Sequence, residues 1–258
     1  MLRSLFKINE EEVKIVLEKL KLEKINNLFI ASDLGKLGII KNKNYTLAFI
    51  HNLIKKLNKN INIVVPTANF NMINSQETFD FLKTPSFRMG AFSEYIRLQE
   101  GSVRSAHPIW SLSGLGPDTK RLFENISDHA YDENSSFSRL FDNDYYFLSF
   151  GKHPRFMLSI VHHLETINKV PYRFKKGFKI KILKNNNTIE KEFFLNVLKD
   201  EYRNKPRARN KKIFEVFENS FNVKNYKVGN GTISFFRLKD FATSTSELMK
   251  KDLYCWFK

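Results

Sequence analysis

The hydrophobic residues in the first quarter of the chain form two short continuous runs with a helix-like pattern between them. LFIA (28–31) and INIVV (61–65) are apolar throughout, which is typical of strands buried on both faces. The residues between them that recur at the spacing of one helix face are Leu47, Ile50, Leu53, Ile54 and Leu57. This pattern predicts a helix over about 46–58. Strand, helix and strand in this order predict a βαβ unit with two parallel strands.

An amphipathic helix is expected before this unit. Asn9 can cap its start, and Glu12 occupies the capping-box position three residues later. The apolar face that follows consists of Val13, Val16, Leu17 and Leu20. Because ligands of open α/β sheets bind beyond the carboxyl ends of the strands, Ser32, Asp33 and Thr67 are expected at the functional edge.

The rest of the chain continues in a mixed α/β pattern. YYFLSF (145–150) predicts a third buried strand, and a helix is expected at about 156–168. The later elements expected are a hairpin of FKIKIL (178–183) with TIEKEFF, a helix at about 210–221, a glycine hairpin over 223–238 and a helix from about 240. With no clear linker, residues 1–258 are predicted to form one α/β domain with a central mixed sheet.

Residues 68–140 are rich in turn chemistry and poor in periodicity. We expect one helix in this stretch, at about 90–99. A compact domain rarely carries so much irregular chain unless that chain builds a site.

Composition narrows the class of protein. No apolar run approaches the ~18–20 residues of a membrane span. The N-terminus becomes acidic too soon for a signal peptide. Cys255 is the only cysteine, which excludes an intramolecular disulfide framework and a cysteine metal cluster. A cytoplasmic protein without a membrane partner is expected.

The net charge points to anionic partners. Lys and Arg number 43 and Asp and Glu 27, so the formal charge is +16. This favours nucleic acid, phosphorylated cofactors or nucleotide-linked substrates, although a solvated lysine surface would also account for much of it. The stretch 199–212 carries 7 basic and 2 acidic residues, which suits a nucleic-acid patch, a phosphate clamp or an exposed basic loop.

The sequence SIVHHLE (159–165) carries the sharpest chemical signal. On a helix His162 and Glu165 share a face, so the carboxylate can hold the imidazole in one tautomer, as a general base requires. An ordinary surface or core hydrogen bond explains the same pair. His163 points elsewhere, and neither this pair nor the distant His107 and His129 has the spacing of a zinc motif, so no metal is expected.

Three glycine-containing loops form a second constellation. SDLGKLG (32–38), RMGAF (88–92) and SGLGPD (113–118) place small residues next to main-chain N–H groups. Such loops can bind phosphates or the amides of a pantetheine arm, and each can equally be a simple turn.

Read together, the segments resemble the aminoglycoside 3-N-acetyltransferase family, and within it the members that acylate amino sugars in surface-polysaccharide pathways. The matching pieces are SDLGKLG (32–38), VVPT (64–67), TPSFRMGAFSEYIR (84–97), VRSAHPIWSLSGLGP (103–117), SSFSRL (135–140), VHHLETINKVPYRF (161–174) and GNGTISFFRLKDF (229–241). The resemblance implies a three-layer α/β/α fold with a central mixed sheet, unlike the commoner GNAT acetyltransferase fold. It also implies acetyl-CoA as acyl donor and no metal.

The resemblance further implies a set of site residues. His162 matches the catalytic histidine, Glu165 the acid that follows it, and Asp33 an acid of the first loop. The positions matched to coenzyme A binding are Ser32, Asp33, Leu34, Arg88, Met89, Gly90, His107, Ser111 and Ser135. The chain departs from the family pattern at Ala31, Ser113, Ser136 and Ser159.

The expected reaction is direct transfer of an acetyl group to an amine of a sugar, with His162 as general base. Because the chain is basic, the expected acceptor is a nucleotide-linked deoxy amino sugar for glycan or lipopolysaccharide synthesis. An aminoglycoside acetyltransferase conferring resistance is the alternative. A basic nucleic-acid-binding protein, a binding-only family member and a homodimer remain open.

Overall fold

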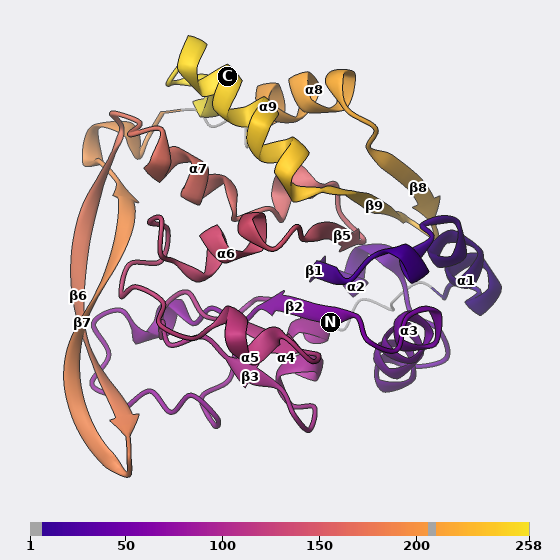
Figure 1. The fold of residues 1–258 in the computed structure, drawn as a ribbon, viewed down its shortest axis with the longest axis horizontal. Coiled ribbons are helices and arrows are strands. Elements are labelled where there is room, and N and C mark those ends of the chain that lie inside the picture. Colours follow the sequence, from indigo (N-terminus) through magenta and orange to yellow (C-terminus); the bar gives the residue numbers. More distant parts are fainter. Residues whose placement is uncertain (1–6, 206–209, 258) are drawn as a thin grey trace.

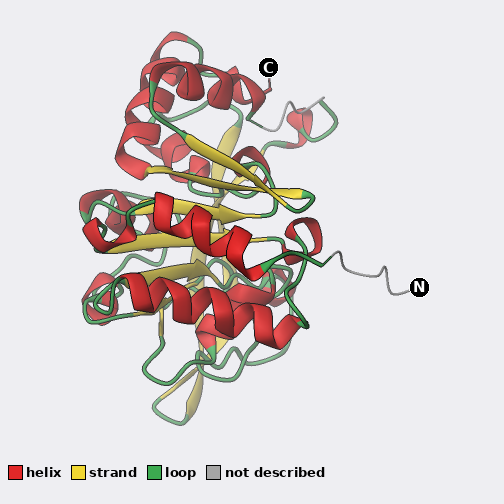
Figure 2. Cartoon of the chain, turned by 90° about the vertical axis from the view of Figure 1, so that its right-hand side faces the viewer, coloured by secondary structure: helices red, strands yellow, loops and turns green. Residues whose placement is uncertain are grey.

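The fold is built on one large mixed sheet, seen in a computed structural model that describes residues 7–205 and 210–257. Within these residues the sheet has seven strands in the order β3-β4-β2-β1-β5-β9-β8. The strands are β1 (Asn27–Ser32), β2 (Asn62–Pro66), β3 (Val103–Arg104), β4 (Leu112–Leu115), β5 (Tyr146–Phe150), β8 (Lys224–Val228) and β9 (Gly231–Arg237). Figure 2 shows these strands lying side by side with helices packed against them.

The centre of the sheet is the predicted βαβ unit. β1 is parallel to β2 and, on its other side, to β5. β4 and β9 then run antiparallel to β2 and β5, which makes the sheet mixed. All five residues of β2 and five of the six in β1 are buried, so the continuous apolar runs do mark strands covered on both faces. The predicted mixed α/β fold is confirmed.

Two hydrophobic cores lie on opposite faces of this sheet. Alternate residues of β1 enter different cores: Phe29 packs in one, and Leu28 and Ile30 in the other. The α-helices that cover the faces are α1 (Glu10–Lys19), α2 (Leu34–Leu37), α3 (Lys43–Leu57), α4 (Ala91–Arg97), α5 (Thr119–Leu122), α6 (Ser136–Asp142), α7 (Val161–Ile167), α8 (Lys211–Ser220) and α9 (Leu238–Lys251). Residues of α1 to α4 enter one core and residues of α5 to α9 the other, which gives the expected three layers.

A long hairpin stands beside these layers, along the left of Figure 1. Its strands are β6 (Arg173–Lys184) and β7 (Asn187–Leu198), which pair antiparallel along their whole length. Ile180 and Phe193 bury their side chains in the same core as α7. The hairpin therefore forms one wall of the region around α7, and its first residue, Arg173, lies close to the helix that carries His162.

Two local predictions need correction. Asn9 does cap α1, but Glu12 does not complete a capping box; its carboxylate accepts from the main-chain N–H of Gly229 at 3.4 Å. The single helix expected at 156–168 is a short 3-10 turn, η3 (Pro154–Phe156), followed by α7. In the described residues, no helix has the length and apolarity needed to cross a bilayer.

Candidate active site: two adjoining cavities

The first cavity lies at the carboxyl end of β1. It has a volume of about 530 Å³. Ser32, Asp33 and Leu34 line it, as do Arg88, Met89 and Gly90. The six expected coenzyme A residues of the first two loops therefore share one cavity, at the sheet edge where ligands of open α/β folds gather.

Gly90 lets the second loop approach β1 closely. Its φ is +93°, and a Cβ at this position would lie 2.5 Å from the main-chain oxygen of Ser32. Any other residue would be strained by the backbone conformation and would collide with β1. The loop and the strand end can form a narrow cavity because residue 90 lacks a side chain.

The first cavity has a basic lining. Lys43 and Arg88 line it without an ion-pair partner among the described residues, while Lys152 pairs with Asp33 at 2.5 Å. The Ser32 hydroxyl is buried and makes no hydrogen bond there. A cavity that holds cations without an ion pair and an unpartnered hydroxyl suits a phosphorylated ligand with a polar arm.

The second cavity adjoins the first. It has a volume of about 230 Å³ and is lined by His162 and by Arg155, Asn210 and Trp256. Phe156, Met157 and Ser159 line both cavities. The segment between η3 and α7 is therefore the boundary at which a ligand in the first cavity would meet His162.

His162 is held by a carboxylate from its own helix. Its Nδ1 lies 2.6 Å from Oε2 of Glu165, one turn later on α7. Glu165 is completely buried, whereas the His162 side chain is 25% exposed. Because an ionised carboxylate can only accept, Nδ1 carries the proton and Nε2 keeps a lone pair. Nε2 has no partner among the described residues.

The surroundings keep His162 neutral and Glu165 ionised. Burial lowers the pKa of His162, the charge of Arg173 lowers it further, and Glu165 opposes both. Burial alone would raise the pKa of the Glu165 carboxyl, but the interactions with His162, Arg173 and Tyr172 bring it below its ordinary value. An uncharged imidazole beside a carboxylate can accept a proton near neutral pH.

Three of the expected coenzyme A residues lie inside the protein and line neither cavity. Ser135 caps α6 and donates to the carbonyl of Asp132. His107 is 1% exposed and accepts from the main-chain N–H of Trp110, and burial lowers its pKa to about 4. The hydroxyl of Ser111 donates to the carbonyl of Thr67. Their partners are all internal, so we do not include them in the proposed site.

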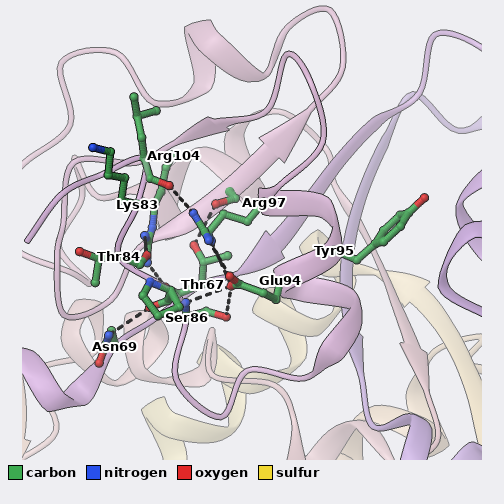
Figure 3. Close-up of polar contacts among 12 residues, drawn as sticks. Thr67, Asn69, Lys83, Thr84, Ser86, Glu94, Tyr95, Arg97 and Arg104 are labelled. Carbon is green, nitrogen blue, oxygen red and sulfur yellow. Dashed lines mark hydrogen bonds and ion pairs between the residues drawn. The ribbon is translucent and has the colours of Figure 1, made fainter. Parts of the chain in front are cut away.

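Ser111 belongs to a network around a half-buried arginine, Arg104, seen in part in Figure 3. Arg104 donates to the carbonyls of Thr67 and Thr84 and to the Ser111 hydroxyl. Burial lowers the pKa of Arg104 to about 10. This guanidinium fixes the chain beyond β2, so the polar residues of 103–113 form a scaffold behind the first cavity.

The walls of the second cavity include residues that the sequence did not single out. Arg155, Asn210 and Trp256 come from the segment after β5, the start of α8 and the C-terminal turn. Arg173 packs against Trp256, with its guanidinium carbon 5.4 Å from the centre of the Trp256 ring. Of these four residues, only Arg173 lies in a segment that the family resemblance covered, VHHLETINKVPYRF (161–174). Arg155 lies close to His162 in the chain, whereas Asn210 and Trp256 reach the site through long-range packing.

Two other expectations bear on the site. The residues that the structure describes contain no group of three His, Cys, Asp or Glu side chains placed to hold a metal. Residues 206–209 of the basic stretch lie outside the described residues. In its described parts Arg203 pairs with Asp200 and Lys211 with Glu215, so the stretch is partly neutralised.

The fold brings together a basic cavity and, adjoining it, a cavity lined by a histidine that a buried carboxylate holds in place. The family model described as aminoglycoside 3-N-acetyltransferase matches residues 29–250. The chain belongs to this family. It is therefore an N-acetyltransferase that takes its acetyl group from acetyl-CoA and acts on amino sugars.

Solved structures share the fold along nearly the whole chain. YokD protein from Bacillus subtilis is 19% identical, with 96% of each chain covered and a TM-score of 0.79. Sisomicin-bound AAC-VIa is 20% identical over 94% of this chain and 98% of its own, with a TM-score of 0.81. AAC-IIIb in a binary complex with CoASH is 14% identical over 95% and 97%, with a TM-score of 0.79. No curated protein matches the sequence.

Proposed function

We propose that the protein acetylates an amine of an aminoglycoside directly from acetyl-CoA, with His162 as general base. The observation that carries this proposal is the Glu165-bound imidazole in the second of two adjoining cavities. The first cavity is large and basic, which suits the donor, and an acceptor in the second would lie against Nε2 of His162.

The proposed step is a single displacement. The amine nitrogen attacks the thioester carbonyl carbon while Nε2 of His162 removes a proton from the amine. Collapse of the resulting oxyanion breaks the C–S bond, and the imidazolium returns the proton to the departing thiolate. Glu165 stabilises the imidazolium meanwhile. Ser159 lines both cavities, so its hydroxyl is a candidate donor to the oxyanion; the internally bonded Ser111 is not.

The donor would lie in the first cavity. Its phosphates suit Lys43 and Arg88, and its pantetheine arm would run along the wall formed by Ser32 and Gly90 toward Met157. Asp33 holds Lys152 here, so we assign it to donor binding and not to proton transfer.

An aminoglycoside is the first acceptor to test, because membership of the family favours it. The experiment is a thiol-release assay with acetyl-CoA and a panel of aminoglycosides, with the product identified by mass spectrometry. We expect acceptor-dependent release of coenzyme A and a mass increase of one acetyl group. Release that no amine stimulates would refute the proposal.

An amino sugar that carries an anionic group is a second candidate, favoured by the charge of the second cavity. Arg155 lines this cavity without an ion pair, and none of the described lining residues is Asp or Glu. A polycationic acceptor would meet repulsion there, whereas a phosphate beside the sugar would be attracted. The nucleotide-linked deoxy amino sugar predicted from the sequence belongs to this class.

Ionic strength separates the two acceptors. With an amino sugar phosphate, kcat/KM should fall as salt is added, and Arg155→Gln should lower it by about tenfold. With an aminoglycoside, salt and Arg155→Gln should leave kcat/KM unchanged or raise it. Turnover of the aminoglycoside alone would eliminate the second candidate.

A further inference from the structure

Arg173 forms an ion pair with the carboxylate oxygen to which the histidine donates. Its Nε lies 2.6 Å from Oε2 of Glu165, the same oxygen that lies 2.6 Å from Nδ1 of His162. Tyr172 donates to the other oxygen, Oε1, at 2.9 Å. A carboxylate buried as completely as Glu165 remains ionised only with such compensation, so these three contacts fix both its charge and its orientation.

Arg173 is itself fixed in place. Its side chain is 10% exposed, and it donates to the carbonyl of Asn196 at 3.2 Å. The ring of Trp256 packs over its guanidinium. These contacts hold the cation beside Glu165, and its charge acts on His162 mainly through the protein interior, where screening is weaker than in water.

The groups that face His162 come from several elements. Those that can carry charge are Glu165 on α7, Arg173 and the adjacent Tyr172 at the start of β6, Tyr131 before α6, Arg155 at η3 and Cys255 in the C-terminal turn. Burial raises the pKa of Tyr131 well above its ordinary value and that of Cys255 to about 11, so both are neutral. Glu165 and Arg173 are then the buried charges nearest the imidazole.

We propose that Arg173 is a positioning residue, which anchors Glu165 against His162 and, by its charge, keeps the imidazole neutral between turnovers. Without Arg173, the buried carboxylate would stabilise the imidazolium too strongly, and Nε2 of His162 would already be protonated when an amine arrives. With it, Glu165 still orients the ring through Oε2. This inference rests on the proposed role of His162.

The test replaces Arg173 and measures His162 by two routes. In Arg173→Met, NMR titration of the His162 ring should show its pKa raised by about 1 unit, because a nearby positive charge has been removed. The acid limb of kcat/KM should move to higher pH by the same amount. Arg173→Lys keeps the charge and should return both values toward those of the wild type.

Two further variants separate charge from structure. Tyr172→Phe removes a hydrogen bond from the same carboxylate without changing charge, so turnover should fall while the acid limb stays in place. Lys175→Met removes a cation of β6 that packs on Phe194, away from Glu165, and should change neither quantity. An unchanged His162 pKa in folded Arg173→Met, or an equal shift in Tyr172→Phe, would overturn the inference.

The inference and the proposed function can fail separately. If His162→Ala retained normal turnover, the general-base proposal would fall. The NMR titration would still measure whether Arg173 sets the protonation of His162. If Arg173→Met did not fold, Arg173→Lys and Tyr172→Phe would be compared instead. The inference requires the acid limb of kcat/KM to stay at the wild-type pH in both variants. Movement of that limb in either variant would contradict it.

Discussion

The two cavities differ in how the chain builds them. The first is made from short loops at the strand ends, where residues close in sequence lie together: Ser32 to Gly35 and Arg88 to Ala91. The second combines one continuous segment, Arg155 to His162, with Asn210 and Trp256 from the C-terminal part of the chain. We expect the first cavity to bind the donor and the second to bind the acceptor. Changes in the first should therefore affect donor binding, and changes in the second should affect turnover.

The largest effect is expected from Glu165→Gln in the second cavity. The amide can no longer stabilise an imidazolium, so turnover at saturating acetyl-CoA should fall by at least ~10²-fold. Stabilisation of the fold by coenzyme A, measured as a thermal shift, should persist. If Glu165→Gln lost coenzyme A binding but kept normal turnover, the assignment of donor binding to the first cavity and of catalysis to the second would be reversed.

Arg104→Met should affect stability and neither cavity's chemistry. The substitution leaves the carbonyl of Thr84 without the Arg104 donor and removes one of the two side-chain donors to the carbonyl of Thr67, which should lower the free energy of unfolding by about 2 kcal/mol. Urea denaturation measures this loss. Because Ser111 and Arg104 line neither of the two cavities of the site, kcat/KM of the folded protein should stay near that of the wild type. A large fall in kcat/KM would show that the network of Arg104 and Ser111 belongs to the active site.

Gly90→Ala should weaken donor binding. A Cβ there meets the Ser32 oxygen, so the first cavity must widen, and KM for acetyl-CoA should rise by about tenfold with kcat little changed. The matched control is Gly101→Ala, where φ is +77° but nothing lies within 4 Å of the added atom. Equal effects on KM would mean that backbone strain, and not the contact with β1, is responsible.

The smallest effect expected concerns the pH dependence of kcat/KM in the unmodified protein. Because the pKa of His162 lies below its ordinary 6.5, the imidazole is neutral at pH 7, and kcat/KM should have reached its plateau at that pH. As pH falls below the pKa of His162, the imidazole gains a proton, and kcat/KM should drop tenfold per pH unit. A limb that begins above pH 7 would contradict the environment of His162 described above.

Sequence patterns predicted the first cavity better than the second. Continuous apolar runs identified β1, β2 and β5, and the rule for strand ends placed Ser32 and Asp33 at the functional edge. Helical spacing paired His162 with Glu165 because both lie within one turn. Trp256 was missed, since nothing near it in sequence signals that tertiary packing brings it to α7, and Arg155 lies in the same segment as His162 but carries no motif of its own. Ser111 stays a prediction; in the structure its hydroxyl bonds to Thr67 and it lines neither cavity.

The most direct test of the central claim is turnover by His162→Ala. Acetyl transfer would be measured by thiol release at saturating donor and acceptor, and coenzyme A binding by thermal shift. The account predicts that turnover falls by at least ~10²-fold while the fold and donor binding remain. Turnover near that of the wild type would contradict it, because no other imidazole in the described residues lines the second cavity.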